Sequence, residues 1–280
     1  MEITFSIFPK FFKHLDVKGL AAMVREVGLD TTNLVIRDGY WVTPGGLAKE
    51  APAFVRAMAE EGLSVRFATA GFSAEEVVRD PAPVQVLADA GITEFRMGYF
   101  RPGKDVRDLG AAVEEARGQL EAMCPVLERI GIRAIYQVHH GTLVPGPSGI
   151  YHLVKGLPSA QVGVMLDPGN QCYEGFEQWD RSARLLGDHL VAFGVKDTAV
   201  RRDDSAACDP DKGWRREWAP CDEGVTNWYD VVRAIRGIDF RGTFVWQPFY
   251  NEKEPDVMRE KLAREVAYVR RVVAAVEAEG

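Results

Sequence analysis

Eight short apolar runs alternate with segments of helical periodicity along this 280-residue chain. This alternation constrains the fold more than any other feature, because strand, helix and next strand form the repeating unit of parallel α/β proteins. The runs are nearly continuous in apolar residues, as expected for parallel strands with both faces covered. The predicted strands span Ile3–Phe8, Thr32–Arg37, Ser64–Thr69, Glu94–Tyr99, Arg133–Val138, Val162–Leu166, Leu190–Val195 and Thr243–Gln247.

Between the strands, apolar residues recur at the three- and four-residue steps of an amphipathic helix. One stripe spans Val113–Ile130 and stops at Gly131, a residue that commonly ends helices. Another spans Met258–Val276, and Pro255 near its start suits a first helical turn. A third predicted helix contains Phe54, Met58 and Leu63, and Pro81 and Pro83 divide the segment after Gly71 into a short piece and a longer one.

Eight β-α units without a linker, a low-complexity segment or an obvious repeat predict a closed (β/α)8 barrel, with residues 1–280 as one domain. An open, doubly wound sheet is the structural alternative. Such sheets bind dinucleotides at a G-x-G-x-x-G turn, and no predicted strand is followed by one, so no nucleotide cofactor is expected. In a barrel, functional groups lie at the C-terminal ends of the strands.

Charge and composition argue against several classes of partner. The net charge is −7 and acidic and basic residues are interleaved, so nucleic acid is not expected. No stretch approaches the roughly 18 apolar residues that span a bilayer, and Glu2 and Pro9 do not fit a signal peptide. The cysteines show neither CxxC spacing nor the density of a disulfide framework, which favours a cytoplasmic location; they are Cys124, Cys172, Cys208 and Cys221.

The ends of the predicted strands carry a ring of polar and aromatic side chains. Such a ring suits a small carbohydrate, because aromatic faces contact C–H groups and polar side chains bind hydroxyls. The ring comprises Lys10, His14, Arg37, Asp38, Tyr40, Trp41, Arg96, Tyr99, Arg101, Gln137, His139, His140, Asp167, Pro168, Gly169, Asn170, Lys196, Asp197 and Gln247.

Several short motifs in this ring resemble those of one known family. QVHHGT, LDPGN, GVKD and VWQPF end the last four predicted strands, and the turn APCDEGVTNW precedes the final unit. In this order they resemble the sugar isomerase/epimerase group of xylose isomerase-like barrels, over essentially the whole chain. That group includes ketose 3-epimerases, inosose dehydratase, dehydroshikimate dehydratase and keto-glycoside lyases. The resemblance therefore implies carbohydrate chemistry without choosing the reaction.

The resemblance also implies a metal site, which this chain has altered. In the family pattern a divalent ion is held by Glu, Asp, His and Glu on strands 5 to 8, and the matching positions here are Gln137, Asp167, Gly194 and Gln247. One carboxylate and two amides bind Mg²⁺ poorly. If His139 supplies the missing imidazole, the set Gln137, His139, Asp167 and Gln247 favours Mn²⁺, Zn²⁺ or Fe²⁺ over Mg²⁺. Whether a metal is bound stays open.

The same changes remove the paired carboxylates that the family's epimerases use as acid and base, since a glutamine cannot accept the proton. The predicted catalytic residues are His139, Lys196 and Asp167, with His140 and Asp197 as further groups able to move a proton. Strand alternation places His139 on the same face as Gln137 and turns His140 away. Asp167 could instead only begin a turn, and Lys196 could instead only pair with Asp167 or Asp197.

Substrate binding is predicted for a second group of side chains at the strand ends. Arg37 and Arg96 could bind substrate or pair with acids at the barrel top, and these alternatives are not separated by sequence. The full predicted set is Arg37, Trp41, Arg96, Tyr99, His140, Asn170 and Trp218.

A long loop over the C-terminal face is predicted at about residues 198–223, because this segment exceeds an ordinary αβ connection. Loops of this length are commonly lids or binding loops, and Trp214, Arg215 and Trp218 are its residues of interest. The tryptophans could stack on a sugar or cover apolar surface in a homodimer.

Three functional hypotheses follow. The first is a sugar isomerase/epimerase-family enzyme that abstracts a proton next to a carbonyl in a sugar, polyol or keto-sugar, leading to isomerisation, epimerisation or elimination. The second is a catalytically degenerate barrel that binds a sugar or serves as a partner subunit, motivated by the lost ligands. The third is a nuclease on a related barrel, which the five histidines and the acidic charge balance disfavour.

Overall fold

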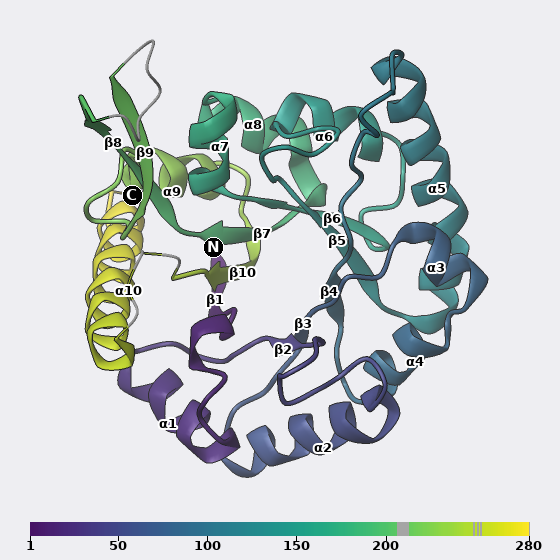
Figure 1. Ribbon diagram of the computed structural model, residues 1–280, viewed down its shortest axis with the longest axis horizontal. Coiled ribbons are helices and arrows are strands. Elements are labelled where there is room, and N and C mark those ends of the chain that lie inside the picture. The colour runs from purple at the N-terminus through teal and green to yellow at the C-terminus, as the bar shows by residue number, and fades with distance from the viewer. Residues whose placement is uncertain (206–212, 249, 251, 253, 280) are drawn as a thin grey trace.

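A barrel of eight parallel strands forms the centre of the protein in the computed structural model, which describes all residues except 206–212, 249, 251, 253 and 280 (Figure 1). The strands are hydrogen-bonded in the order β1-β10-β7-β6-β5-β4-β3-β2. Their bounds are β1 Glu2–Ile7, β2 Leu34–Val35, β3 Phe67–Thr69, β4 Glu94–Arg96, β5 Arg133–Gln137, β6 Val162–Leu166, β7 Leu190–Val195 and β10 Arg241–Trp246.

The first and last strands of that order are brought together by hydrogen bonds from the segment before β2. The backbone N–H of Asn33 donates to Ile7 O at 2.8 Å, and the N–H of Asp30 donates to Phe5 O at 2.8 Å. The Ser6 hydroxyl donates to Asn33 Oδ1 at 2.6 Å. These contacts close the ring and confirm the predicted (β/α)8 barrel over an open sheet.

All eight predicted strands are present. The bounds of β6 and β7 match the prediction, whereas β2 shrinks to Leu34–Val35. The flanking Thr32 and Asn33 use their side chains and backbone to bind β1 and β3. Local hydrogen bonding of this kind competes with ladder formation, which is why apolar runs overestimate strand length here.

Helices surround the barrel and cover its outer face (Figure 1). The predicted stripe before Gly131 lies in α5, and Gly131 ends it with φ of 79°. Phe54 and Met58 lie in α2, but Leu63 lies beyond its end. The helices are α1 Val17–Glu26, α2 Leu47–Glu60, α3 Ala74–Arg79, α4 Ala82–Asp89, α5 Leu109–Ile130, α6 Pro147–Val154, α7 Pro168–Glu174, α8 Trp179–Leu186, α9 Trp228–Arg236 and α10 Pro255–Glu277, with 3-10 turns η1 Lys10–Phe12 and η2 Gly187–His189.

Apolar side chains fill the space inside the barrel as well as the layer beneath the helices. The small interior cluster comprises Phe67, Ile135, Met165, Val191, Ala192 and Val245, with Phe8 packed against it. A larger cluster lies between the strands and the helices. The interior cluster makes the centre of the barrel a packed core rather than a channel between its two ends.

The segment predicted as a long loop, at about residues 198–223, contains a β-hairpin. Strand β8 (Asp197–Arg202) pairs antiparallel with β9 (Trp214–Ala219), and Thr198 lies opposite Trp218. The charged residues that make up RRD and the centre of WRREW give this segment a hydrophilic composition, from which two short strands were not predicted. Cys208 lies outside the described residues.

Within the described ranges, no helix has the length and apolarity needed to cross a membrane. The three cysteines that the structure describes, Cys124, Cys172 and Cys221, are buried free thiols.

Candidate functional site

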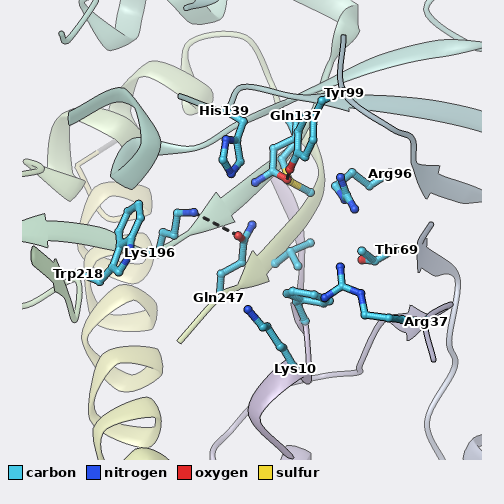
Figure 2. Close-up of a pocket in the computed structure, with 13 residues that line it drawn as sticks. Lys10, Arg37, Thr69, Arg96, Tyr99, Gln137, His139, Lys196, Trp218 and Gln247 are labelled. Atoms are coloured by element: carbon cyan, nitrogen blue, oxygen red, sulfur yellow. Dashed lines mark hydrogen bonds between the residues drawn. The ribbon is translucent and has the colours of Figure 1, made fainter. Parts of the chain in front are cut away.

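A pocket of about 310 Å³ opens at the C-terminal ends of the strands (Figure 2). Its position agrees with the general rule that barrel enzymes place their active sites at this end. The lining residues come from most of the strands and from the hairpin: Phe8, Lys10, Arg37, Thr69, Arg96, Tyr99, Gln137, His139, Met165, Lys196, Trp218, Val245 and Gln247.

A buried ion pair lies at the centre of one side of this pocket. Lys196 Nζ is 3.3 Å from Asp167 Oδ2 and donates to Gln247 Oε1 at 3.4 Å (Figure 2). The ammonium also lies 4.6 Å from the centre of the Trp218 ring, within range of a cation–π interaction. Burial lowers the pKa of Lys196 and raises that of Asp167, while the attraction between them opposes both changes.

Asp167 has little capacity left for another ligand. Its Oδ1 accepts the Asn170 N–H at 2.9 Å and so caps α7, and its Oδ2 accepts Gln137 Nε2 at 2.7 Å besides facing Lys196. The side chain is fully buried. The carboxylate is therefore surrounded by hydrogen-bond donors from three different elements.

The orientation of the Gln137 amide follows from this carboxylate. Only the NH₂ group can donate to Asp167, so the amide oxygen faces the other way and accepts the Tyr99 hydroxyl at 2.8 Å. Burial raises the pKa of Tyr99, which keeps the phenol protonated and able to donate. Gln137 is thus held as a bridge between Tyr99 and Asp167.

The four positions matched to the family's metal ligands do converge. A Cβ atom at Gly194 would lie 2.5 Å from Gln247 Nε2 and 2.7 Å from Asp167 Oδ2, and Gln137 touches the same carboxylate. Gly194 and Lys196 are two residues apart on one strand end and face the same side. Where the family has an imidazole and an ion, this chain has a glycine and a lysine ammonium.

These residues do not fit a divalent cation. Both oxygens of Asp167 accept N–H groups, the Gln137 oxygen accepts a hydroxyl, and Gln247 Oε1 accepts the ammonium. A cation placed among them would lie against the positive charge of Lys196. In addition, the described part of the chain contains no group of three or more His, Cys, Asp or Glu side chains arranged to hold a metal. The donor set disagrees with the predicted Mn²⁺, Zn²⁺ or Fe²⁺ site.

His139 lies on the pocket wall beside Tyr99, with 4.8 Å between the ring centres. Its Nδ1 lies 2.8 Å from the carbonyl oxygen of His140, which only an N–H can bind, so Nε2 carries the lone pair. Burial, together with the charge of Lys196, lowers the pKa of His139 to about 4. The imidazole is therefore neutral at physiological pH, with Nε2 unprotonated.

Three residues predicted to bind substrate do not line the pocket. His140 Nδ1 lies 2.9 Å from Asn170 Oδ1, and its ring stacks between His139 and Tyr173. Asn170 is fully buried, and its side-chain amide donates to Val138 O. Trp41 donates to Leu15 O and packs on Phe54. Each of these side chains has at least one hydrogen-bond partner in the protein, and their contact with a substrate stays a prediction.

Arg37, Arg96, Tyr99 and Trp218 do line the pocket, together with the predicted catalytic residue Lys196. Trp214 is half exposed on the hairpin, and Arg215 forms ion pairs with Asp203 and Glu217 outside the pocket. Sequence analysis placed Lys10 in the polar ring without giving it a role, and it missed Thr69. Lys10 follows the first strand directly, and that position was the available signal.

Comparison with solved structures finds the same fold at low sequence identity. The chain resembles a xylose isomerase-like TIM barrel protein from Mycobacterium smegmatis in complex with magnesium, with 16% identity, 98% and 97% of the two chains covered and a TM-score of 0.70. It resembles the IOLI protein with a bound zinc atom, with 14% identity, 99% of each chain covered and a TM-score of 0.74. It also resembles the 3-keto-D-glucoside 4-epimerase YcjR from E. coli, with 14% identity, 97% and 99% covered and a TM-score of 0.65.

No curated protein sequence matches the chain. The family model described as xylose isomerase-like TIM barrel matches residues 82–269, which include strands β4 to β7, β10 and every position of the altered metal site. With its barrel and its strand-end motifs in the expected order, the chain belongs to the xylose isomerase-like TIM barrel family.

Proposed function

We propose that this protein moves a proton at a carbon next to a carbonyl group in a sugar, polyol or keto-sugar, as an isomerase, an epimerase or a dehydratase. Family membership supports carbohydrate chemistry, and one structural neighbour is a 3-keto-D-glucoside 4-epimerase. The observation that carries the proposal is the position of Lys196, whose ammonium lies where the family's ligand positions converge.

In this proposal Lys196 supplies the positive charge that stabilises the oxyanion formed when a proton leaves the neighbouring carbon. The ammonium is fixed between Asp167 and Gln247, and it borders the pocket. A donor held in place before the reaction stabilises developing charge without reorganising, and it acts more strongly in a site that excludes water. The Asp167 carboxylate keeps the buried amine charged.

His139 is the proposed base. Its Nε2 takes the proton, the C–H electron pair forms a C=C bond, and the carbonyl π pair moves onto the oxygen beside Lys196. Addition of a solvent proton to the same carbon from the other face, with the His139 proton released to solvent, gives an epimer. Return of the proton to the former carbonyl carbon, while the hydroxyl on the neighbouring carbon passes its proton to the oxyanion and becomes the new carbonyl, gives an isomer. Loss of hydroxide from the next carbon, protonated by the His139 imidazolium, gives the dehydrated product and water.

Solvent proton exchange tests this proposal. The chelated protein is incubated in D₂O with neutral and acidic ketoses and keto-glycosides, and deuterium entry next to the carbonyl is followed by NMR. Exchange is expected without added metal. Lys196→Met and His139→Ala should each slow it about 100-fold or more, as for a lost acid-base or oxyanion-stabilising group.

Exposed residues of α6 and its end provide matched controls. Lys155→Met and His152→Ala remove the same side chains outside the pocket and should leave exchange unchanged. Exchange that requires added Mn²⁺ or Zn²⁺ would contradict the role of Lys196. If ketoses stabilise the protein against heat without any exchange, the alternative of a sugar-binding barrel without catalysis is correct instead.

A further inference from the structure

The pocket is strongly cationic in a chain whose net charge is −7. Four of its lining residues, Lys10, Arg37, Arg96 and Lys196, carry a positive charge, and none of the described lining residues is an aspartate or glutamate. Asp167 lies behind the wall and is paired with Lys196. Three cations therefore remain at the pocket beyond the one that the proposed reaction uses.

A second cavity in the same barrel shows that this imbalance is specific to the pocket. The cavity of about 520 Å³ at the opposite, N-terminal ends of the strands contains Arg66 and Arg241. There the arginines are accompanied by Glu2, Asp30 and Glu94, so opposite charges are mixed. Mixed charges are what a solvated barrel end normally carries.

Arg96 is held in a fixed orientation at the pocket wall. Its Nη1 donates to Met97 O at 3.1 Å, its Nη2 donates to Ala70 O at 3.2 Å, and the guanidinium lies 4.9 Å from the centre of the Tyr99 ring. Carbonyl oxygens are neutral, so they orient the guanidinium without cancelling its charge. This leaves a preorganised cation beside the pocket, suited to an oxyanion.

Arg37 lies at the exposed rim of the pocket, near the rings of Phe8 and Tyr40. Across the described ranges, neither Arg37 nor Arg96 has a carboxylate within 4.0 Å. The sequence alternative that these arginines pair with acids at the barrel top is therefore not what the structure shows.

Lys10 and Arg37 are close enough for their charges to repel. Burial and the Arg37 charge both lower the pKa of Lys10. Figure 2 shows Arg37 and Arg96 reaching into the pocket on the side away from Trp218, with Thr69 between them, and the Lys10 ammonium turned toward Gln247. An anion placed among them would relieve the repulsion and receive charge-assisted hydrogen bonds.

We propose that Lys10, Arg37 and Arg96 form an oxyanion subsite, so that the substrate of the proposed reaction is an acidic sugar carrying a carboxylate or a phosphate. This inference rests on the proposed function for the reacting end of the molecule. The anionic group binds at the subsite, and the carbonyl carbon lies between Lys196 and His139. A pocket of about 310 Å³ suits a small monosaccharide derivative of this kind.

Calorimetric binding to the chelated full-length protein tests the subsite separately from the reaction. The probes are D-fructose, D-fructose 6-phosphate, 5-keto-D-gluconate and inorganic phosphate. At least one acidic sugar should bind about tenfold or more tightly than D-fructose, and its affinity should fall between 50 and 300 mM NaCl. Preference for fructose 6-phosphate and inorganic phosphate identifies a phosphate subsite, and preference for 5-keto-D-gluconate identifies a carboxylate subsite.

Substitutions locate the site. Arg37→Gln should weaken binding of the acidic sugar about tenfold, and Lys10→Gln combined with it about 100-fold, with binding of D-fructose unchanged. Arg37 is exposed and donates no side-chain hydrogen bond to a described residue, so its substitution should leave the fold intact. Arg241→Gln at the opposite end of the barrel is the matched control and should change neither affinity.

Equal binding of neutral and acidic sugars, or acidic-sugar binding that Arg37→Gln and the double variant leave unchanged, would overturn the subsite. Failure of the subsite and failure of the reaction are distinguishable. Exchange on D-fructose without preference for acids supports the reaction and contradicts the subsite. Tight, Arg37-dependent binding of an acidic sugar without exchange supports the subsite and contradicts the reaction.

Discussion

Lys196 and Asp197 are adjacent in the chain, and both are buried charged residues, yet they lie on opposite sides of the same strand end. Lys196 enters the pocket between Asp167 and Gln247. Asp197 points away from it, where it accepts hydrogen bonds from Thr198 N, from both N and Oγ1 of Thr226, and from Trp228 Nε1. Asp197, a candidate for proton transfer in the sequence, therefore does not line the pocket.

The difference teaches that burial and a displaced pKa do not by themselves mark a functional residue. Burial raises the pKa of Asp197 to about 6, although the group never reaches the pocket. All hydrogen-bond donors to Asp197 are protein groups. The space beside the carboxyl is filled, because a Cβ atom at Gly224 would lie only 2.0 Å from Asp197 Cγ. Lys196 differs because one side of its ammonium faces a cavity large enough for a ligand.

The largest expected effect comes from Asp197→Ala. The substitution leaves four buried hydrogen-bond donors without an acceptor. Each unsatisfied donor costs about 1–3 kcal/mol before relaxation, so we expect the free energy of unfolding to fall by roughly 3–5 kcal/mol. Urea unfolding followed by circular dichroism measures it. Asp197→Asn keeps one acceptor oxygen and should lose less.

Lys196→Met is the matched pocket variant. It should cost less stability than Asp197→Ala, because Asp167 keeps the N–H groups of Asn170 and Gln137 as hydrogen-bond donors. An equal or greater loss for Lys196→Met would break the comparison, since the lysine would then be as structural as the aspartate.

The next expected effect is a pH dependence of stability, which arises from Glu265, a second buried acid on the same side of the strand end as Asp197. Glu265 accepts the Cys221 N–H and the Tyr250 hydroxyl, and burial raises its pKa to about 7. Folded Glu265 therefore holds a proton that the unfolded chain releases, so stability falls as pH rises from about 4 to about 7 and is then constant. Over the roughly 2.5 units involved, the loss is about 3 kcal/mol.

Urea midpoints of the natural protein and Glu265→Gln between pH 4.5 and 8 isolate this contribution. Asp197 acts in the same direction between about 4 and 6, and His139, whose pKa is lowered, acts in the opposite direction between about 4 and 6.5. Both remain in the variant, so the difference between the two curves reports Glu265. Parallel curves would show that the carboxyl is not buried as described.

The fold was predictable because its signal is repeated along the chain. Eight apolar runs at regular intervals determine a barrel even when single strands such as Leu34–Val35 are shorter than predicted. The β8–β9 hairpin was not predicted, because its strands carry consecutive exposed arginines and are stabilised by pairing with each other. Cross-strand pairing of this kind leaves no apolar period in the sequence.

The sequence predicted which positions would lie at the site, but it did not predict which partners their side chains would contact. Strand ends and the family pattern identified Gln137, Asp167 and Gln247, and alternation placed His139 beside them. The missed signal was the pair Gly194 and Lys196. Gly194 stands where the family has a histidine ligand, and Lys196 follows two residues later on the same face, which suggests that its ammonium replaces the metal ion. Asn170 and Trp41 could not be judged from sequence, because their partners, Val138 O and Leu15 O, are backbone atoms of distant segments.

A smaller effect tests the electrostatic coupling inside the pocket. Lys196 lowers the pKa of His139, so Lys196→Met should raise the His139 pKa from about 4, on the order of one unit. Titration of the imidazole Cε1 proton by NMR measures this shift. Asp197→Asn alters a charge on the other side of the strand and should leave His139 nearly unchanged. An unchanged His139 in Lys196→Met would mean that the two groups do not share one site.

The smallest effect compares two tryptophans on one strand. Trp218 covers the Lys196 ammonium at 4.6 Å, whereas Trp214 is half exposed, so Trp218→Leu should destabilise the protein by roughly 1 kcal/mol and Trp214→Leu by less than about 0.5 kcal/mol. In the Lys196→Met background the Trp218 effect should shrink, because the part of it due to the cation is already lost. A double-mutant cycle from urea unfolding measures that coupling. A coupling of zero would show that Asp167 and Gln247 stabilise Lys196 without help from the Trp218 ring. Trp218 would then only line the pocket.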